Sequence, residues 1–75
     1  MKRIIYKVWW ATADENQNGI YHASEPFKTE KEAQKFAKQK WETADFVSID
    51  KRHEIYEDYD WRQQDGTETE IIEVE

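Results

Sequence analysis

The first stretch of the chain alternates between two faces with a period of two residues. Over residues 3–11, one face carries Ile4, Tyr6, Val8 and Trp10, and the other carries Ile5, Lys7, Trp9 and Ala11. Successive side chains of a strand point to opposite faces, so this pattern predicts a strand whose first set of residues faces the core. Trp9 is then expected on the opposite face of the sheet.

Further strands are predicted from turn signals and from apolar, β-branched runs. Asn18-Gly19 is a typical hairpin turn, and it predicts a second strand over residues 20–25 that Pro26 ends. Residues 46–56 predict a third strand, and residues 67–74, after the Asp65-Gly66 turn, predict a final one. The intervening stretch, residues 57–66, is polar with embedded aromatic residues, and we expect a flexible loop there.

One helix is predicted over about residues 30–43. Thr29 followed three residues later by Glu32 forms a capping box, in which each side chain binds the backbone N–H of the other residue. The residues that follow repeat with helical spacing and predict one apolar stripe, made of Ala33, Phe36, Ala37, Trp41 and Ala44.

These elements predict the α+β class in the order ββαββ, with a small antiparallel sheet and one helix packed on one face. The 75 residues suffice for a single domain. Leucine is absent, and Leu, Ile, Val and Phe together supply only 13 residues, a fraction typical of disordered chains. Four Trp and four Tyr offset this shortage, because each can bury a large area, so we expect a folded chain with an aromatic core.

Several chemistries are disfavoured by composition. The chain has no cysteine, which excludes disulfides and thiolate sites, and it has no apolar run long enough to cross a membrane. The two histidines, His22 and His53, stand in no known metal-binding spacing, and the two glycines cannot form a phosphate-binding loop. We therefore expect a cytoplasmic protein without metal, cofactor or catalytic activity. The alternative is an enzyme that uses the carboxylates between Glu54 and Asp60.

Acidic residues concentrate in the last third of the chain. Residues 54–75 hold nine acidic side chains and one arginine, whereas the whole chain has a net charge of −6. The candidate acidic binding residues are Glu57, Asp58, Asp60, Glu68 and Glu70. On one strand, Glu68 and Glu70 would lie about 7 Å apart, similar to neighbouring phosphates, so a DNA-mimicking surface is one hypothesis. The alternative is that these residues only maintain solubility.

Aromatic residues on the uncovered sheet face form a second candidate surface, composed of Trp9, Tyr21 and Tyr56. Exposed aromatic patches are typical of partner interfaces. The alternative is that Trp9 is covered by residues 57–64 or by a second copy of the chain in a homodimer.

A lysine stripe along the predicted helix is the third candidate, formed by Lys28, Lys31, Lys35 and Lys38. Such a stripe could follow a phosphate backbone, or it could be the solvated face of an amphipathic helix.

From these features we expect a small, acidic, non-enzymatic interaction or regulatory protein. It would bind a protein partner through the acidic C-terminal third or the aromatic sheet face. Size and composition are typical of accessory proteins of bacteria and phage-type mobile elements. The alternative function is nucleic-acid binding through the lysine stripe together with the sheet aromatics.

Overall fold

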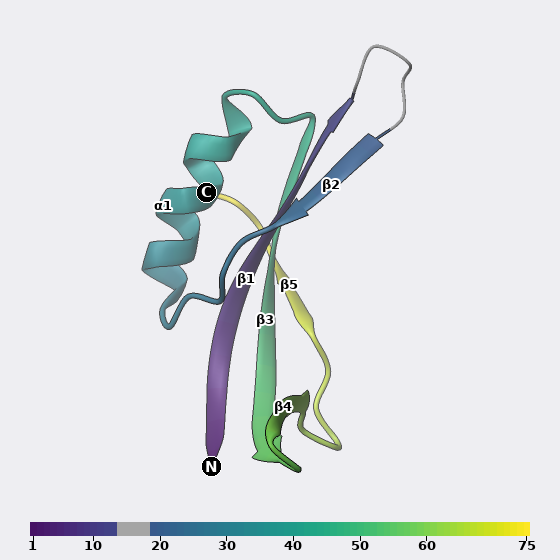
Figure 1. Ribbon diagram of the computed structural model, residues 1–75. Coiled ribbons are helices and arrows are strands. Elements are labelled where there is room, and N and C mark those ends of the chain that lie inside the picture. Colours follow the sequence, from purple (N-terminus) through teal and green to yellow (C-terminus); the bar gives the residue numbers. More distant parts are fainter. Residues whose placement is uncertain (14–18) are drawn as a thin grey trace.

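A computed structural model describes residues 1–13 and 19–75 of the chain (Figure 1). The elements are, in order, β1 (Lys2–Ala13), β2 (Gly19–Ala23), α1 (Glu30–Trp41), β3 (Phe46–Glu57), β4 (Asp60–Gln63) and β5 (Glu70–Ile72). The turn signal at Asn18-Gly19 lies partly outside the described residues. In the part of the chain that is described, no helix has the length and apolar content needed to cross a membrane.

The five strands form one antiparallel sheet in the order β2-β1-β3-β4, and β5 pairs with β3 beside β4. Two long strands, β1 and β3, run side by side along the whole molecule, and α1 packs against one face of them (Figure 1). The predicted α+β class with one helix on an antiparallel sheet is thus confirmed at that level. The order ββαββ is wrong in detail, because β4 occupies the middle of residues 57–66, where we expected a loop.

The strand β4 exists because a tight turn reverses the chain after β3. Glu57 pairs with Asp60, and the two turn residues, Asp58 and Tyr59, both have positive φ angles of 51° and 66°. Two consecutive positive φ values are typical of a type I′ turn, whose twist matches that of a two-stranded hairpin. Glycine or asparagine usually occupies these positions, and because neither is present, this turn could not be predicted from the residue types.

The helix begins at Glu30, directly after the cap residue Thr29, as the sequence predicted. The backbone N–H of Glu32 donates to the Thr29 hydroxyl oxygen at 3.3 Å, and that hydroxyl donates to the Glu32 carboxylate at 3.0 Å. The capping box predicted that this carboxylate would instead accept from the Thr29 backbone N–H. The helix ends at Trp41, two residues earlier than expected.

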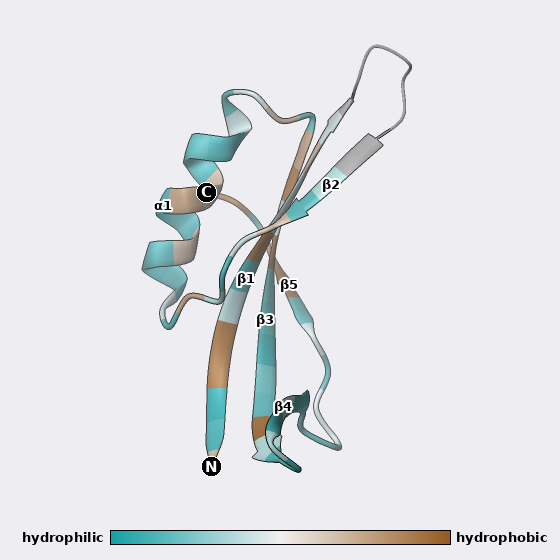
Figure 2. Cartoon of the chain, in the orientation of Figure 1, coloured by the Kyte–Doolittle hydropathy of each residue, from teal (hydrophilic) through white to brown (hydrophobic). Residues whose placement is uncertain are grey.

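The core lies between α1 and the middle of the sheet. Its buried centre is small and aliphatic, consisting of Val8, Ala33, Ala37, Val47 and Ile49. Aromatic side chains surround this centre, and Phe36 contacts both Trp10 and Phe27, with ring centroids 5.4 and 5.3 Å apart. Figure 2 shows hydrophobic positions along β1 and β3 and a mostly hydrophilic α1. The aromatic residues therefore enclose an aliphatic centre and do not make up the core alone.

Two residues that were expected in the core are half exposed. Ile4 is 44% exposed and Trp41 is 46% exposed. A helix of 12 residues is roughly 18 Å long, whereas a strand of 12 residues is roughly 40 Å long. The helix consequently covers Tyr6, Val8 and Trp10 but leaves Ile4 beyond its end.

The C-terminal residues are held by a buried side chain of α1. The Gln34 amide donates to the backbone oxygen of Glu73 at 2.9 Å and accepts from the N–H of Glu75 at 3.0 Å. These bonds draw the chain away from β3 and toward α1, where the C-terminus lies (Figure 1). For this reason β5 ends at Ile72, and the final strand is shorter than the predicted 67–74.

Candidate binding surface

The sheet face opposite α1 carries the odd-numbered residues of β1, because the even-numbered residues Tyr6, Val8 and Trp10 pack against the helix side. We call this face the open face. Strand register arranges its residues in rows across the sheet. One row contains Tyr21, Ala11 and Phe46. The next row contains Ala23, Trp9 and Ser48.

The end of the open face near β2 is apolar and exposed. Tyr21 is 72% exposed and Phe46 is 51% exposed, and they flank the small side chain of Ala11. Trp9 lies in the adjacent row, and the ammonium of Lys7 lies 5.2 Å from the centre of its ring. Ile71, which pairs with Asp50 on the same face, is 77% exposed. We call Trp9, Tyr21, Phe46 and Ile71 the apolar end; Trp9 is partly buried, whereas the other three side chains are exposed.

The opposite end of the open face, near β4, is charged, and Arg3 and Arg52 there form ion pairs with Glu54, although the buried Nε of Arg52 has no hydrogen-bond partner among the described residues. Arg3 binds the buried carboxylate of Glu54, with Nη2 and Oε1 2.7 Å apart. The guanidinium of Arg3 also lies 3.9 Å from the centre of the Trp61 ring, and Tyr56 contacts that ring edge-on at 5.3 Å. Because these groups already bind one another, this end offers fewer free contacts to a partner than the apolar end does.

All three aromatic residues predicted for the open face lie on it, but they do not form one patch. Trp9 and Tyr21 lie together at the apolar end, whereas Tyr56 lies at the far end of β3 beside Trp61. Sequence reasoning missed Phe46 and Ile71, which complete the apolar end. Only the strand register identifies these two residues. It places Phe46 and Tyr21 on either side of Ala11, and it places Ile71 beside Asp50.

The predicted acidic residues are distributed over two regions. Asp58 and Asp60 belong to the β3–β4 hairpin with Glu57, and Asp58 forms an ion pair with Arg62 at 3.3 Å. The expectation that Glu68 and Glu70 share one strand is wrong, because β5 begins at Glu70. Glu70 lies 3.8 Å from the ammonium of Lys51. The regular carboxylate spacing behind the DNA-mimic hypothesis is therefore absent from β5.

The predicted lysine stripe lies on the opposite side of the molecule from the open face. Lys31, Lys35 and Lys38 are exposed on α1, and Lys28 precedes the cap residue Thr29. Because α1 packs against the other face of the sheet, these ammonium groups and the aromatic pair Trp9 and Tyr21 cannot contact the same short ligand strand. The structure thus separates the two parts of the predicted nucleic-acid site.

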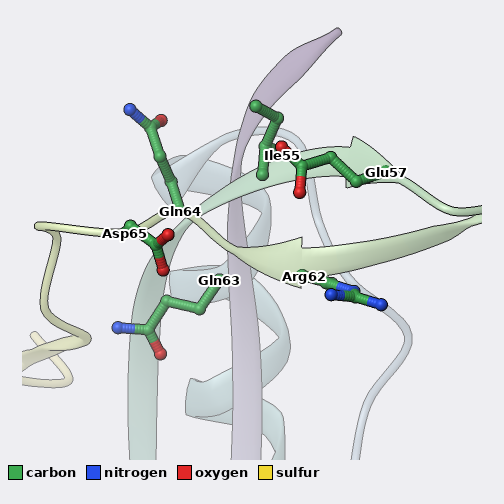
Figure 3. A pocket seen from close by; sticks show the side chains of 6 residues that line it. All are labelled: Ile55, Glu57, Arg62, Gln63, Gln64 and Asp65. Carbon is green, nitrogen blue, oxygen red and sulfur yellow. The ribbon is translucent and has the colours of Figure 1, made fainter.

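A hollow of about 180 Å³ lies beside the β3–β4 hairpin, lined by Ile55, Glu57, Arg62, Gln63, Gln64 and Asp65 (Figure 3). Its polar side chains diverge: in Figure 3, those of Gln64 and Arg62 point away from each other. The carboxylates of Glu54 and Glu57 cannot act together here, because residues three apart on a strand lie on opposite faces.

Metal-binding chemistry has no assembled site in the described part of the chain. Residues 1–13 and 19–75 contain no group of three or more His, Asp or Glu side chains placed to hold a metal ion. His53 pairs with Ile4 and Glu54 pairs with Arg3, so the two side chains lie on opposite faces of β3. His22 instead stacks on Trp10, with ring centroids 5.2 Å apart.

Comparison with known proteins adds no assignment: no protein-family model, curated protein or solved structure matches this chain.

Proposed function

We propose that this protein is a non-enzymatic interaction module that binds a protein partner through the apolar end of its open sheet face. The observation that carries the proposal is the row of Tyr21, Ala11 and Phe46, in which two large side chains are 72% and 51% exposed around a small one. Exposed aromatic side chains grouped on a rigid sheet are typical of protein interfaces and are costly to leave in water.

The charge layout favours a protein partner over a nucleic acid. The residues of the apolar end carry no charge, and the ammonium of Lys7 on the same face already lies 5.2 Å from the centre of the Trp9 ring. Nucleic-acid binding depends on cations that contact phosphates, and the exposed lysines of α1 lie on the other side of the sheet. The acidic third of the chain, with its net charge of −8, would further repel phosphates.

The acidic residues have a secondary role in this proposal. They lie on the β3–β4 hairpin and on the segment before β5, away from the apolar end near β2, and they would favour a partner that carries positive charge at that distance from the aromatic contacts. Such complementarity mainly raises the rate of association, whereas the buried aromatic contacts supply most of the affinity. A second copy of the chain, as in the predicted homodimer, is one form that the partner can take.

The proposal is tested by a matched pair of double variants. Tyr21→Ser with Phe46→Ser removes the exposed aromatic pair, and Lys31→Ser with Lys35→Ser changes two exposed residues on α1. Each is used, with the unchanged protein, to capture partners from extracts of cells that express it, with and without nuclease. The proposal predicts that a specific protein is lost with the first variant only. Equal capture by both variants would contradict it.

A further inference from the structure

An apolar groove lies at the edge of the sheet, next to the open face. Its volume is about 490 Å³, and it is lined by Trp41, Phe46, Val47, Ser48, Ile71, Ile72, Glu73 and Val74. Trp41, at the end of α1, closes one side, and Phe46 and Ile71 connect the groove to the apolar end of the open face. The half-exposed Trp41 therefore belongs to a continuous apolar surface that the chain itself does not bury.

At this groove, the edge of β3 continues beyond the end of its ladder with β5. The ladder between β3 and β5 ends at the pair Ile49–Ile72, two residues before it would reach Val47. The chain leaves β3 at that point because Gln34 binds the backbone of Glu73 and Glu75.

The backbone of Val47 faces the groove. The oxygen of His53 accepts from Gln64 on the β4 side, whereas the N–H of Tyr56 donates to Met1 on the β1 side. Bonding direction alternates along a strand, so odd-numbered residues of β3, including Val47, direct their N–H and C=O toward the edge that β4 and β5 use. No residue of β5 pairs with Val47, which is 6% exposed, and a strand edge beyond the end of its neighbour is a template for an added strand.

The charges around the groove select among possible occupants. Among the described residues that line the groove, Glu73 alone is charged and none is a cation, and Glu42 directly follows Trp41 in sequence. An occupant with apolar side chains and positive charges is thus complementary to it, whereas an acidic segment is repelled.

We propose that this groove binds an extended, basic and apolar segment of the protein partner, which adds a strand to the edge of β3 at Val47. Backbone hydrogen bonds would supply the register, and apolar side chains would occupy the space beside Trp41, as in other cases of strand addition. This inference rests on the proposed function and specifies the part of the partner that the groove recognises.

The test uses a capped six-residue peptide in which lysine and valine alternate, with a second peptide carrying glutamate in place of lysine as the control. Each is titrated into the uniformly ¹⁵N-labelled protein while the amide signals and the indole signal of Trp41 are followed by NMR. We expect saturable shifts of Val47, Ile72 and the Trp41 indole with the lysine peptide, and at least tenfold weaker binding of the glutamate peptide. Ile71→Ser should weaken binding at least fivefold, whereas Lys35→Ser, at an exposed position of α1 outside the groove, should leave it unchanged.

Each of the remaining outcomes contradicts the groove proposal, and each shows whether the proposed function still stands. Shifts confined to Trp9 and Tyr21 would move the binding site to the open face, so the groove proposal fails while the proposed function stands. Shifts at the groove that depend on protein concentration without peptide would assign it to a second copy of the chain. No saturable shift with the lysine peptide would also overturn the groove proposal, while partner capture by a Tyr21→Ser variant, which leaves the groove lining intact, tests the proposed function separately.

Discussion

Arg3 and Glu54 form an ion pair across β1 and β3, between residues 51 positions apart in sequence. Arg3 donates from Nε to the Glu54 carboxylate at 2.9 Å, and Glu54 is only 5% exposed. Arg52 approaches the second carboxylate oxygen at 3.9 Å. The charged end of the open face is therefore organised around one buried anion.

Removal of that anion should destabilise the fold. Glu54→Ala leaves Arg3 and Arg52 close together without their shared partner, and we expect the free energy of unfolding to fall by about 2–4 kcal/mol. Urea denaturation followed by tryptophan emission measures the change. Glu68→Ala, at an exposed acidic position, is the control and should change stability by less than about 0.5 kcal/mol. Similar losses in the two variants would show that the buried pair is unimportant.

The small aliphatic core should be sensitive to truncation at one isoleucine and insensitive at another. Ile49 is fully buried, whereas Ile71 is 77% exposed on the neighbouring strand. We expect Ile49→Ala to cost about 2–5 kcal/mol and Ile71→Ala to cost well under 1 kcal/mol. Thermal or urea unfolding of both variants provides the comparison. A difference below 1 kcal/mol between them would contradict the assigned core.

The β3–β4 turn should be improved by residues that suit positive φ. Asp58→Asn combined with Tyr59→Gly supplies the preferred type I′ pair, and we expect a gain of about 1 kcal/mol in unfolding free energy. The Tyr59 side chain is 95% exposed, so its removal loses little packing. Tyr59→Phe keeps the backbone strain and is expected to have no effect. A loss of stability in the double variant would mean that the Asp58–Arg62 ion pair and the contacts of Tyr59 together outweigh the strain.

The strands β1 and β3 and the helix start could be predicted from sequence because their signals are local. Alternation around Tyr6 and Val8, and the pair Thr29 and Glu32, depend only on near neighbours in the chain. The strand β4 could not be predicted, since its turn uses Asp58 and Tyr59 in a conformation that their residue types rarely adopt.

The candidate surface was predictable only in part, because its composition depends on long-range register. Strand alternation places Trp9 opposite the helix, but the position of Phe46 beside Tyr21 follows from pairing with β1. The early end of β5 follows from the bonds of Gln34 to the C-terminal residues, a contact between positions about forty residues apart. Neither contact leaves a pattern in the local sequence.

Nucleic acid should not bind through the combined lysine and aromatic site, because the two parts lie on opposite sides of the sheet. Single-stranded and duplex oligonucleotides titrated at low salt should cause no saturable change in tryptophan emission. Low salt gives electrostatic attraction its greatest range, so the absence of binding there is decisive. A saturable, salt-sensitive change that Lys31→Gln with Lys35→Gln removes would instead support the lysine stripe.

Site-specific photo-crosslinking tests the central claim most directly, because it reports what contacts the open face in the cell. A photoreactive phenylalanine analogue is placed at Tyr21 on the open face or, as a matched exposed control, at Lys35 on α1. We expect a discrete adduct from position 21 that contains a second polypeptide and survives nuclease, with none from position 35. An adduct from position 35 alone, no adduct from position 21, or an adduct that nuclease removes would contradict the central claim.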